Sequence, residues 1–225
     1  MVFAAASLRV ALAQAAERWS GDLEVSTAGS HVLRRQIEAG APADVFIPAS
    51  FAHAEAASIL PLLDRPTELV CNDLVLVVPS ESPIHSFEEL SGAQRIVLGT
   101  PDVPVGEYAD VALQRGADAW GARWRERVMH HVVSREIDVR QVLAKVTLGE
   151  ADAALVYASD ARVADVRRID LPTDVRVQAR YPIASVRGAN PDGVRFARWL
   201  RSDQGLEVLF DHGFEPCAVG DLGAP

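Results

Sequence analysis

Two serines stand where an expected strand passes directly into an expected helix. Ser7 follows three alanines and precedes a helical pattern over 8–19, and Ser30 follows Gly29 before a second helical pattern over 32–39. The first N–H groups of a helix are unpaired and lie at the positive end of its dipole, so a hydroxyl there adds to a set of donors for an anion. Serine also caps its own helix at many such positions. The pattern therefore indicates either an anion site or two ordinary helix caps.

Two more helix starts occur in the second half of the chain. One follows Val103 and Pro104 and includes Val105, and the other is the segment that begins at Asp138 and Val139. In an open α/β sheet, ligands bind at the carboxyl ends of the strands, where such helix starts gather. The sequence therefore offers two candidate anion-binding helix starts in each half.

The elements that position these residues alternate along the chain. Short apolar runs rich in β-branched residues predict strands at 23–26, 44–47, 74–78, 95–98, 153–157 and 183–186. Helical patterns fill the gaps at 8–19, 32–39, 108–114, 139–148, 194–200 and 205–212. Such alternation predicts an α/β fold in which mainly parallel sheets are covered by helices on both faces.

The chain is long enough for two lobes. It has 225 residues, and domains usually contain about 50–250. The apolar runs at 74–78 and 181–186 are each followed by turn-forming residues, as if the chain left one lobe and later returned to it. We therefore expect a discontinuous first lobe, 1–77 with 185–225, a second lobe at 78–184, and hinges near 74–80 and 181–187.

Composition excludes several classes of protein. The net charge of −9 and the absence of a basic cluster argue against a nucleic-acid partner. No apolar run approaches the ~18 residues of a membrane span, and no signal peptide opens the sequence. We expect a mature form, either trimmed at a processing site or begun by its gene at this methionine. The two cysteines, Cys71 and Cys217, are expected to be buried free thiols unless the fold brings them together.

Several stretches, in order over nearly the whole chain, resemble the periplasmic molybdate-binding protein family of ABC transporter solute-binding proteins. They are VFAAASL (2–8), QIEAGAPADVFI (36–47), PDVPVGEYA (101–109), VRQVL (139–143), GEADAALVYASDA (149–161) and YPIA (181–184). The resemblance implies a type II periplasmic-binding-protein fold of two lobes, with the ligand in the cleft between them.

The resemblance also implies a ligand set for one oxyanion, molybdate or tungstate. The first lobe would supply the hydroxyl and backbone N–H groups of Ser7 and Ser30. The second would supply the backbone N–H groups of Val105 and Val139 and the phenol of Tyr157. Molybdenum or tungsten would be bound only as the oxyanion, with no metal coordinated directly and no cofactor. This sequence departs from the family pattern at three kinds of position: a valine at 105 where alanine is frequent, His31 and Val32 after the ligand serine, and Pro48 after Ile47.

All of these groups are hydrogen-bond donors, which suits a fully deprotonated tetrahedral dianion, because a protonated anion would also need an acceptor. Charge-assisted bonds contribute about 1.5–3 kcal/mol each, so several can offset much of the desolvation of the dianion. The size of the donor cage should then distinguish molybdate and tungstate from the smaller sulfate.

By the same resemblance, the protein delivers its ligand to the membrane permease of an ABC importer, resides in the periplasm and acts as a monomer without enzymatic activity. Other hypotheses remain open. They are a binding protein for a sulfate-like oxyanion, a serine hydrolase using Ser7, a ferric-ion binder and the sensing domain of a regulator. His130 and His131 are adjacent and so unsuited to form a metal pair, and Asp152 and Asp160, which flank Tyr157, are expected to cap helices or to pair with arginines.

Overall fold

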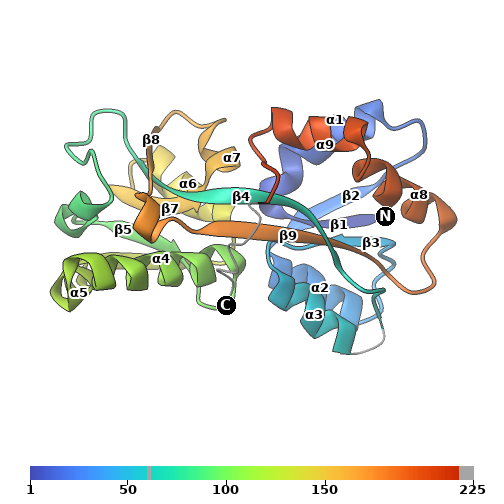
Figure 1. The fold of residues 1–225 in the computed structure, drawn as a ribbon, viewed down its shortest axis with the longest axis horizontal. Coiled ribbons are helices and arrows are strands. Elements are labelled where there is room, and N and C mark those ends of the chain that lie inside the picture. Colours follow the sequence, from blue (N-terminus) through green and yellow to red (C-terminus); the bar gives the residue numbers. More distant parts are fainter. Residues whose placement is uncertain (60–61, 218–225) are drawn as a thin grey trace. The chain divides into compact units, whose positions relative to one another are not determined.

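The computed structural model describes residues 1–59 and 62–217 and divides them into two compact units (Figure 1). Unit 1 comprises 1–72 and 180–217, and unit 2 comprises 73–179. The sequence placed the divisions after residues 77 and 184. The observed divisions, after residues 72 and 179, lie earlier in the same two long strands, β4 (Thr67–Val78) and β9 (Gln178–Ser185). The apolar run at 74–78 therefore belongs to unit 2, and the run at 181–186 belongs to unit 1.

Unit 1 is built on a mixed sheet. Strand β1 (Val2–Ala5) pairs in parallel with β2 (Val25–Ala28) and β3 (Val45–Ile47), and β9 lies antiparallel to β3. In Figure 1, three helices cover one face of this sheet, namely α1 (Arg9–Arg18), α8 (Pro191–Leu200) and α9 (Asp203–Asp211). The other face carries α2 (Ser30–Glu38) and α3 (Phe51–Ile59).

The hydrophobic core beneath α2 and α3 holds this layer of unit 1 together. Phe3 and Phe46 from neighbouring strands pack there with Leu33 and Ile37 of α2, all of them buried. Leu33 and Ile37 are four residues apart and so lie on one face of the helix. Their burial fixes α2 on the sheet and so positions Ser30, the first residue of the helix.

Unit 2 has the same kind of construction. Strand β5 (Ile96–Gly99) pairs in parallel with β6 (Val132–Glu136) and β7 (Ala153–Tyr157), whereas β4 is antiparallel to both β7 and β8 (Arg167–Asp170). Its helices are α4 (Pro104–Trp120), α5 (Ala122–His130), α6 (Val139–Thr147) and the short α7 (Ala158–Ala161). Every residue of β7 is buried, as a continuous apolar run predicts for a central strand.

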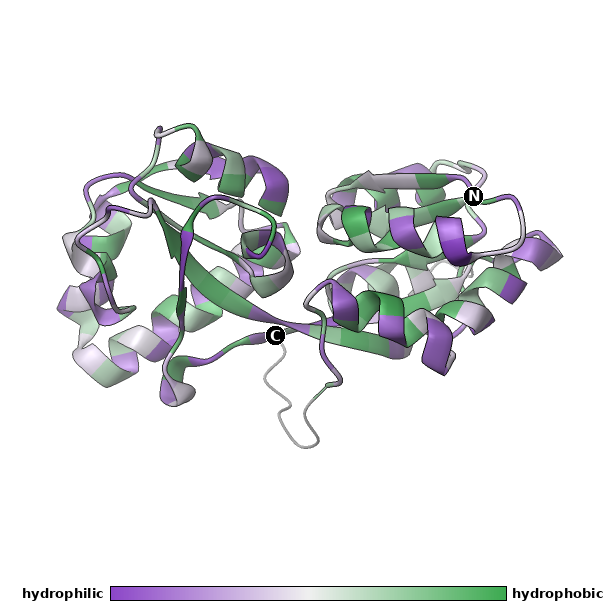
Figure 2. Cartoon of the chain, turned by 90° about the horizontal axis from the view of Figure 1, so that it is seen from above, coloured by the Kyte–Doolittle hydropathy of each residue, from purple (hydrophilic) through white to green (hydrophobic). Residues whose placement is uncertain are grey.

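The α/β class predicted from the sequence is confirmed, with differences in detail. The parallel strands are joined by antiparallel members, β9 in unit 1 and β4 and β8 in unit 2. Helix α3 was not predicted, because its alanine-rich sequence lacks a clear apolar stripe. Helix α4 begins at Pro104, at the helix start expected there, and extends beyond the helical pattern expected at 108–114 in both directions; proline is favoured in the first helical turn. In Figure 2 the strands are mainly hydrophobic, whereas the helices carry both kinds of residue.

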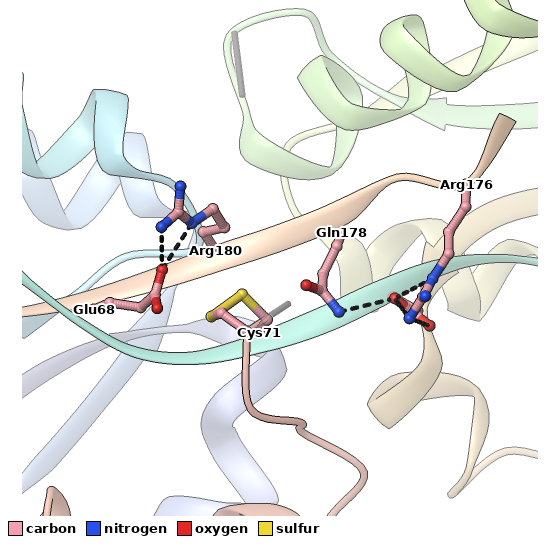
Figure 3. The surroundings of a disulfide bond; sticks show 7 residues. Glu68, Cys71, Arg176, Gln178 and Arg180 are labelled. Carbon is pink, nitrogen blue, oxygen red and sulfur yellow. Dashed lines mark hydrogen bonds and ion pairs between the residues drawn. A yellow bond between two sulfur atoms is a disulfide. The ribbon is translucent and has the colours of Figure 1, made fainter. Parts of the chain in front are cut away.

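Cys71 and Cys217 form a disulfide within unit 1, so the expectation of two free thiols is wrong (Figure 3). The backbone brings them together: Cys71 of β4 exchanges two hydrogen bonds with Glu215, N–H to carbonyl oxygen, of 2.8 and 2.9 Å. Figure 3 also shows the ion pair between Glu68 and Arg180 beside this bridge. Among the helices of the described residues, none has both the length and the apolar character needed to cross a bilayer.

Candidate functional site

The strand register of unit 1 places Ser7 and Ser30 in equivalent positions. Ala4 of β1 pairs with Thr27 of β2, and each serine follows its paired residue by three positions. The two strands are parallel, so both serines lie at the carboxyl edge of the sheet, where ligands of such folds bind. Both side chains are buried, with exposed fractions of 6% for Ser7 and 1% for Ser30.

Ser7 does not cap its helix. It lies in a short 3-10 turn, η1 (Ala6–Leu8), and α1 begins only at Arg9 without a side-chain cap. Its hydroxyl instead forms a buried hydrogen bond of 2.9 Å with the Tyr181 phenol. The ordinary capping role is therefore wrong for this residue, and the hydroxyl is held by a tyrosine from β9.

Ser30 is the first residue of α2 and does not cap that helix either. Val32 and Leu33 donate their N–H groups to the Gly29 carbonyl oxygen, and no side chain caps the helix. The Ser30 hydroxyl oxygen accepts a hydrogen bond of 3.1 Å from the Ala49 N–H. This bond uses the oxygen of Ser30 as an acceptor and leaves the hydroxyl proton available for an anion.

In unit 2, Val105 and Val139 stand at the starts of α4 and α6. The hydrogen bonds to the Val103 carbonyl come from the N–H groups of Gly106 and Glu107, and the Asp138 carbonyl accepts from Val142. Within the described ranges, no acceptor is found for the N–H groups of Val105 or Val139, as expected in the first turn of a helix. Both helix starts thus present backbone donors.

Tyr157 ends β7, and α7 begins at the next residue. Its side chain is buried, and its ring meets that of Tyr108 edge-on with centroids 6.5 Å apart. Leu74 of β4 lies opposite Tyr157 in the sheet. The phenol is therefore fixed by its strand and by an aromatic neighbour from α4, the helix that carries Val105.

Asp160 lies three residues beyond Tyr157 and is the most deeply buried carboxylate near these donors. Its side chain is 0% exposed, and its one ion pair in the described part of the chain is to Arg140 of α6 at 3.8 Å. Burial raises the pKa of Asp160 to about 7, the positive charge of Arg140 opposes that rise, and Asp138 adds to it. The sequence correctly expected Asp160 and Asp152 to pair with arginines, since Asp152 pairs with Arg95.

The rival chemistries find little support in this geometry. The Ser7 hydroxyl is bonded to a tyrosine rather than a histidine, so no activated nucleophile is formed there. The group of possible metal ligands found in the described residues consists of Glu68, Cys71 and Cys217, whose sulfurs are joined in the disulfide. His130 and His131 line a surface hollow of unit 2 together with Arg123, Glu126 and Arg127. They belong to a different unit from Ser7, so the described structure does not pair either histidine with that serine.

Sequence reasoning missed two residues at the carboxyl edge of unit 1, Tyr181 and Ser50. Tyr181 stood in a recognised motif, but its contact with Ser7 depends on the pairing of β9 with β3, which spacing along the chain does not reveal. No motif in the sequence pointed to Ser50, because its equivalence to Ser7 and Ser30 becomes visible only in the register of β3 with β1.

Comparisons with known proteins agree with this architecture. Residues 1–215 match the family model described as bacterial extracellular solute-binding protein. The chain is 35% identical to the molybdate-binding protein ModA of Haemophilus influenzae over 95% of this chain and 88% of that protein.

Two solved structures share the fold. The substrate binding domain of a putative molybdenum ABC transporter from Clostridium difficile has 28% identity and a TM-score of 0.73, with coverage of 96% of this chain and 98% of that one. The periplasmic molybdate-binding protein of Azotobacter vinelandii has a TM-score of 0.82 at 16% identity, with coverage of 96% and 99%, so that likeness concerns the fold alone.

Proposed function

Because the chain belongs to the bacterial extracellular solute-binding protein family, we propose that it binds molybdate or tungstate and delivers it to an ABC-type importer. The relatives confirm the family resemblance read from the sequence, and they are binding proteins rather than enzymes. The observation that carries the proposal is the set of buried or helix-start donors that match that resemblance by position.

In this proposal, both units contribute donors to one anion. Unit 1 offers the hydroxyl and N–H groups of Ser7 and Ser30, and unit 2 offers the N–H groups of Val105 and Val139 with the phenol of Tyr157. The helix starts at Ser30, Val105 and Val139 add the positive ends of three helix dipoles. A dianion is then stabilised by neutral donors, and no cation or cofactor is required.

Binding by two units implies selection of a conformation. An anion that contacts donors from both units favours whichever arrangement lets all of them reach it, and its differential affinity sets the extent of that shift. The loaded form is then the species presented to the importer. We propose that this occurs in the periplasm, that the partner is the membrane permease, and that the protein acts as a monomer.

Selectivity follows from the size of the cage. Donors at helix starts and on buried strands have little freedom to move inward toward a smaller anion. The S–O bonds of sulfate are shorter than the metal–oxygen bonds of molybdate, so several hydrogen bonds from these donors to sulfate would be too long. A sulfate-like ligand is the alternative within the same class of function. The similarity to a molybdate-binding protein favours the larger oxyanions over sulfate.

Isothermal titration calorimetry with molybdate, tungstate, sulfate and phosphate tests the proposal. We expect heat with the first two only. Ser30→Ala and Tyr157→Phe should each weaken binding by about tenfold or more, since a bond to a charged acceptor is worth about 1.5–3 kcal/mol. Absence of heat with both molybdate and tungstate would refute the proposal, and binding of sulfate alone would support the alternative. Turnover of model esters, abolished by Ser7→Ala, would instead indicate a hydrolase.

A further inference from the structure

A third serine stands at the carboxyl edge of the unit 1 sheet, in register with the other two. Ala4 pairs with Thr27 of β2 and with Ile47 of β3. The residues three positions after these are Ser7, Ser30 and Ser50. Three adjacent parallel strands therefore each deliver a serine at the same offset beyond a common row of the sheet.

The hydroxyl of Ser50 has no internal role among the described residues. Its side chain is 3% exposed, and its Oγ atom is buried without a hydrogen-bond partner. A buried hydroxyl without a partner costs about 1–3 kcal/mol, so native proteins seldom leave one unused without a reason. The position directly before α3 would suit a cap, as Asp138 caps α6 and Asn190 caps α8, yet Ser50 forms no such bond.

A hydrogen bond ties the segment that carries Ser50 to a proposed ligand residue. The N–H of Ala49, its chain neighbour, donates to the Ser30 hydroxyl oxygen at 3.1 Å. Contacts between α2 and α3 fix the helices that follow Ser30 and Ser50 against each other. The segment that carries the unused hydroxyl is thus bonded to Ser30, while the hydroxyl itself has no partner that holds it.

We propose that Ser50 is a third hydroxyl donor of unit 1 to the bound oxyanion, so that Ser7, Ser30 and Ser50 form a row of three serines beneath it. The inference rests on the proposed function and adds a residue to the proposed ligand set. The five named residues offer seven donors, and the four oxygens of a tetrahedral dianion, with about two acceptor sites each, leave room for a further one. A hydroxyl without an internal partner loses nothing when it turns toward such a guest.

The test compares Ser50→Ala with the wild type by two measurements that should move in different directions. Molybdate affinity, measured by titration calorimetry, should fall by about 10- to 100-fold, the range for a hydrogen bond to a charged acceptor. The melting temperature of the ligand-free protein should stay unchanged or rise, because the substitution removes an unpartnered buried hydroxyl.

Ser58→Ala provides the matched control on α3. The Ser58 hydroxyl donates to the Ala54 carbonyl at 2.8 Å, so its loss should leave molybdate affinity unchanged. Wild-type affinity in Ser50→Ala would overturn the inference, and so would a fall in both affinity and ligand-free stability, since that would mark Ser50 as structural. Ser50→Cys, of similar size with a weaker donor, should bind at an intermediate level. If the wild-type protein itself gives no heat with molybdate, the proposed function fails rather than this residue assignment alone.

Discussion

The buried Asp160 carboxyl ties the stability of the protein to pH. Its pKa is about 7 in the folded protein, against an ordinary value of 3.8 for an aspartate in an unfolded chain. Between these values the folded protein holds a proton that the unfolded chain has released. The stabilisation is therefore complete below pH 3.8 and is lost as the pH rises through 7.

We predict that Asp160→Asn removes this part of the pH dependence. The amide stays neutral, so the difference in unfolding free energy between variant and wild type should grow in favour of the variant from about pH 5 to about pH 8. Urea denaturation at a series of pH values measures it. A parallel pH dependence in both proteins would show that Asp160 ionises as freely in the folded state as in the unfolded one.

Tyr181 is predicted to orient the proposed ligand hydroxyl of Ser7. If the phenol donates to Ser7 Oγ, the serine proton is directed elsewhere and can reach an anion. Tyr181→Phe should therefore lower the unfolding free energy by about 1 kcal/mol and also weaken molybdate binding. A double-mutant cycle with Ser7→Ala checks the coupling, and strictly additive losses of affinity would contradict it.

At the scale of elements, the start of α4 depends on a glycine. A Cβ at Gly106 would overlap the Thr100 carbonyl oxygen and would lie 2.8 Å from that of Gly99. This close approach lets α4 begin directly against the end of β5, which positions the N–H of Val105. Gly106 belongs to the PDVPVGEYA motif, so the sequence indicated the helix start but not the close contact of Gly106 with the Thr100 carbonyl.

Gly106→Ala should displace the first turn of α4, because the contacted atoms are backbone and cannot move aside cheaply. We expect a loss of about 1–3 kcal/mol in unfolding free energy and weaker molybdate binding. Gly92→Ala is the matched control, since a Cβ there would meet no atom within 4 Å. Thermal denaturation measures the stability of both variants, and titration calorimetry measures their affinity for molybdate. Equal stability and equal affinity of the two variants would disprove the steric argument.

Elements with strong local signals were predictable, and those set by tertiary contacts were not. The five buried apolar residues of β7 were located correctly, as was α6, which begins after its Asp138 cap. The direction of β4 and β9 was not predicted, because an apolar run does not state which strand it will join. Ser7 and Ser30 could be proposed as ligands from their motifs, whereas the roles proposed for Tyr181 and Ser50 depend on the strand pairing and register.

At the scale of the whole molecule, the disulfide is the longest-range covalent constraint in the described residues. It joins Cys71 to Cys217 across a sequence separation of 146 residues, and both lie in unit 1. Closing so long a loop removes chain entropy from the unfolded state, worth on the order of 3–5 kcal/mol. The sequence left this pairing open, because two cysteines far apart give no local evidence of proximity.

The double variant Cys71→Ser and Cys217→Ser should therefore melt at a lower temperature than the oxidised protein. Scanning calorimetry with and without dithiothreitol provides the measurement and its control. The reductant should bring the wild type down to the melting temperature of the variant and leave the variant unchanged. An identical melting temperature for oxidised wild type and variant would argue that the bridge adds no stability.

The insertion of unit 2 within unit 1 sets an order of events during synthesis on the ribosome. Translation releases all of residues 73–179 while unit 1 still lacks its part of β9, α8 and α9. During this time one edge of β3 in the first 72 residues is unpaired, because its antiparallel partner β9 has not yet been made. Cys71 stays unbridged for longer, because Cys217 follows α9 in the chain, so the disulfide can form only after every strand of the unit 1 sheet has been made.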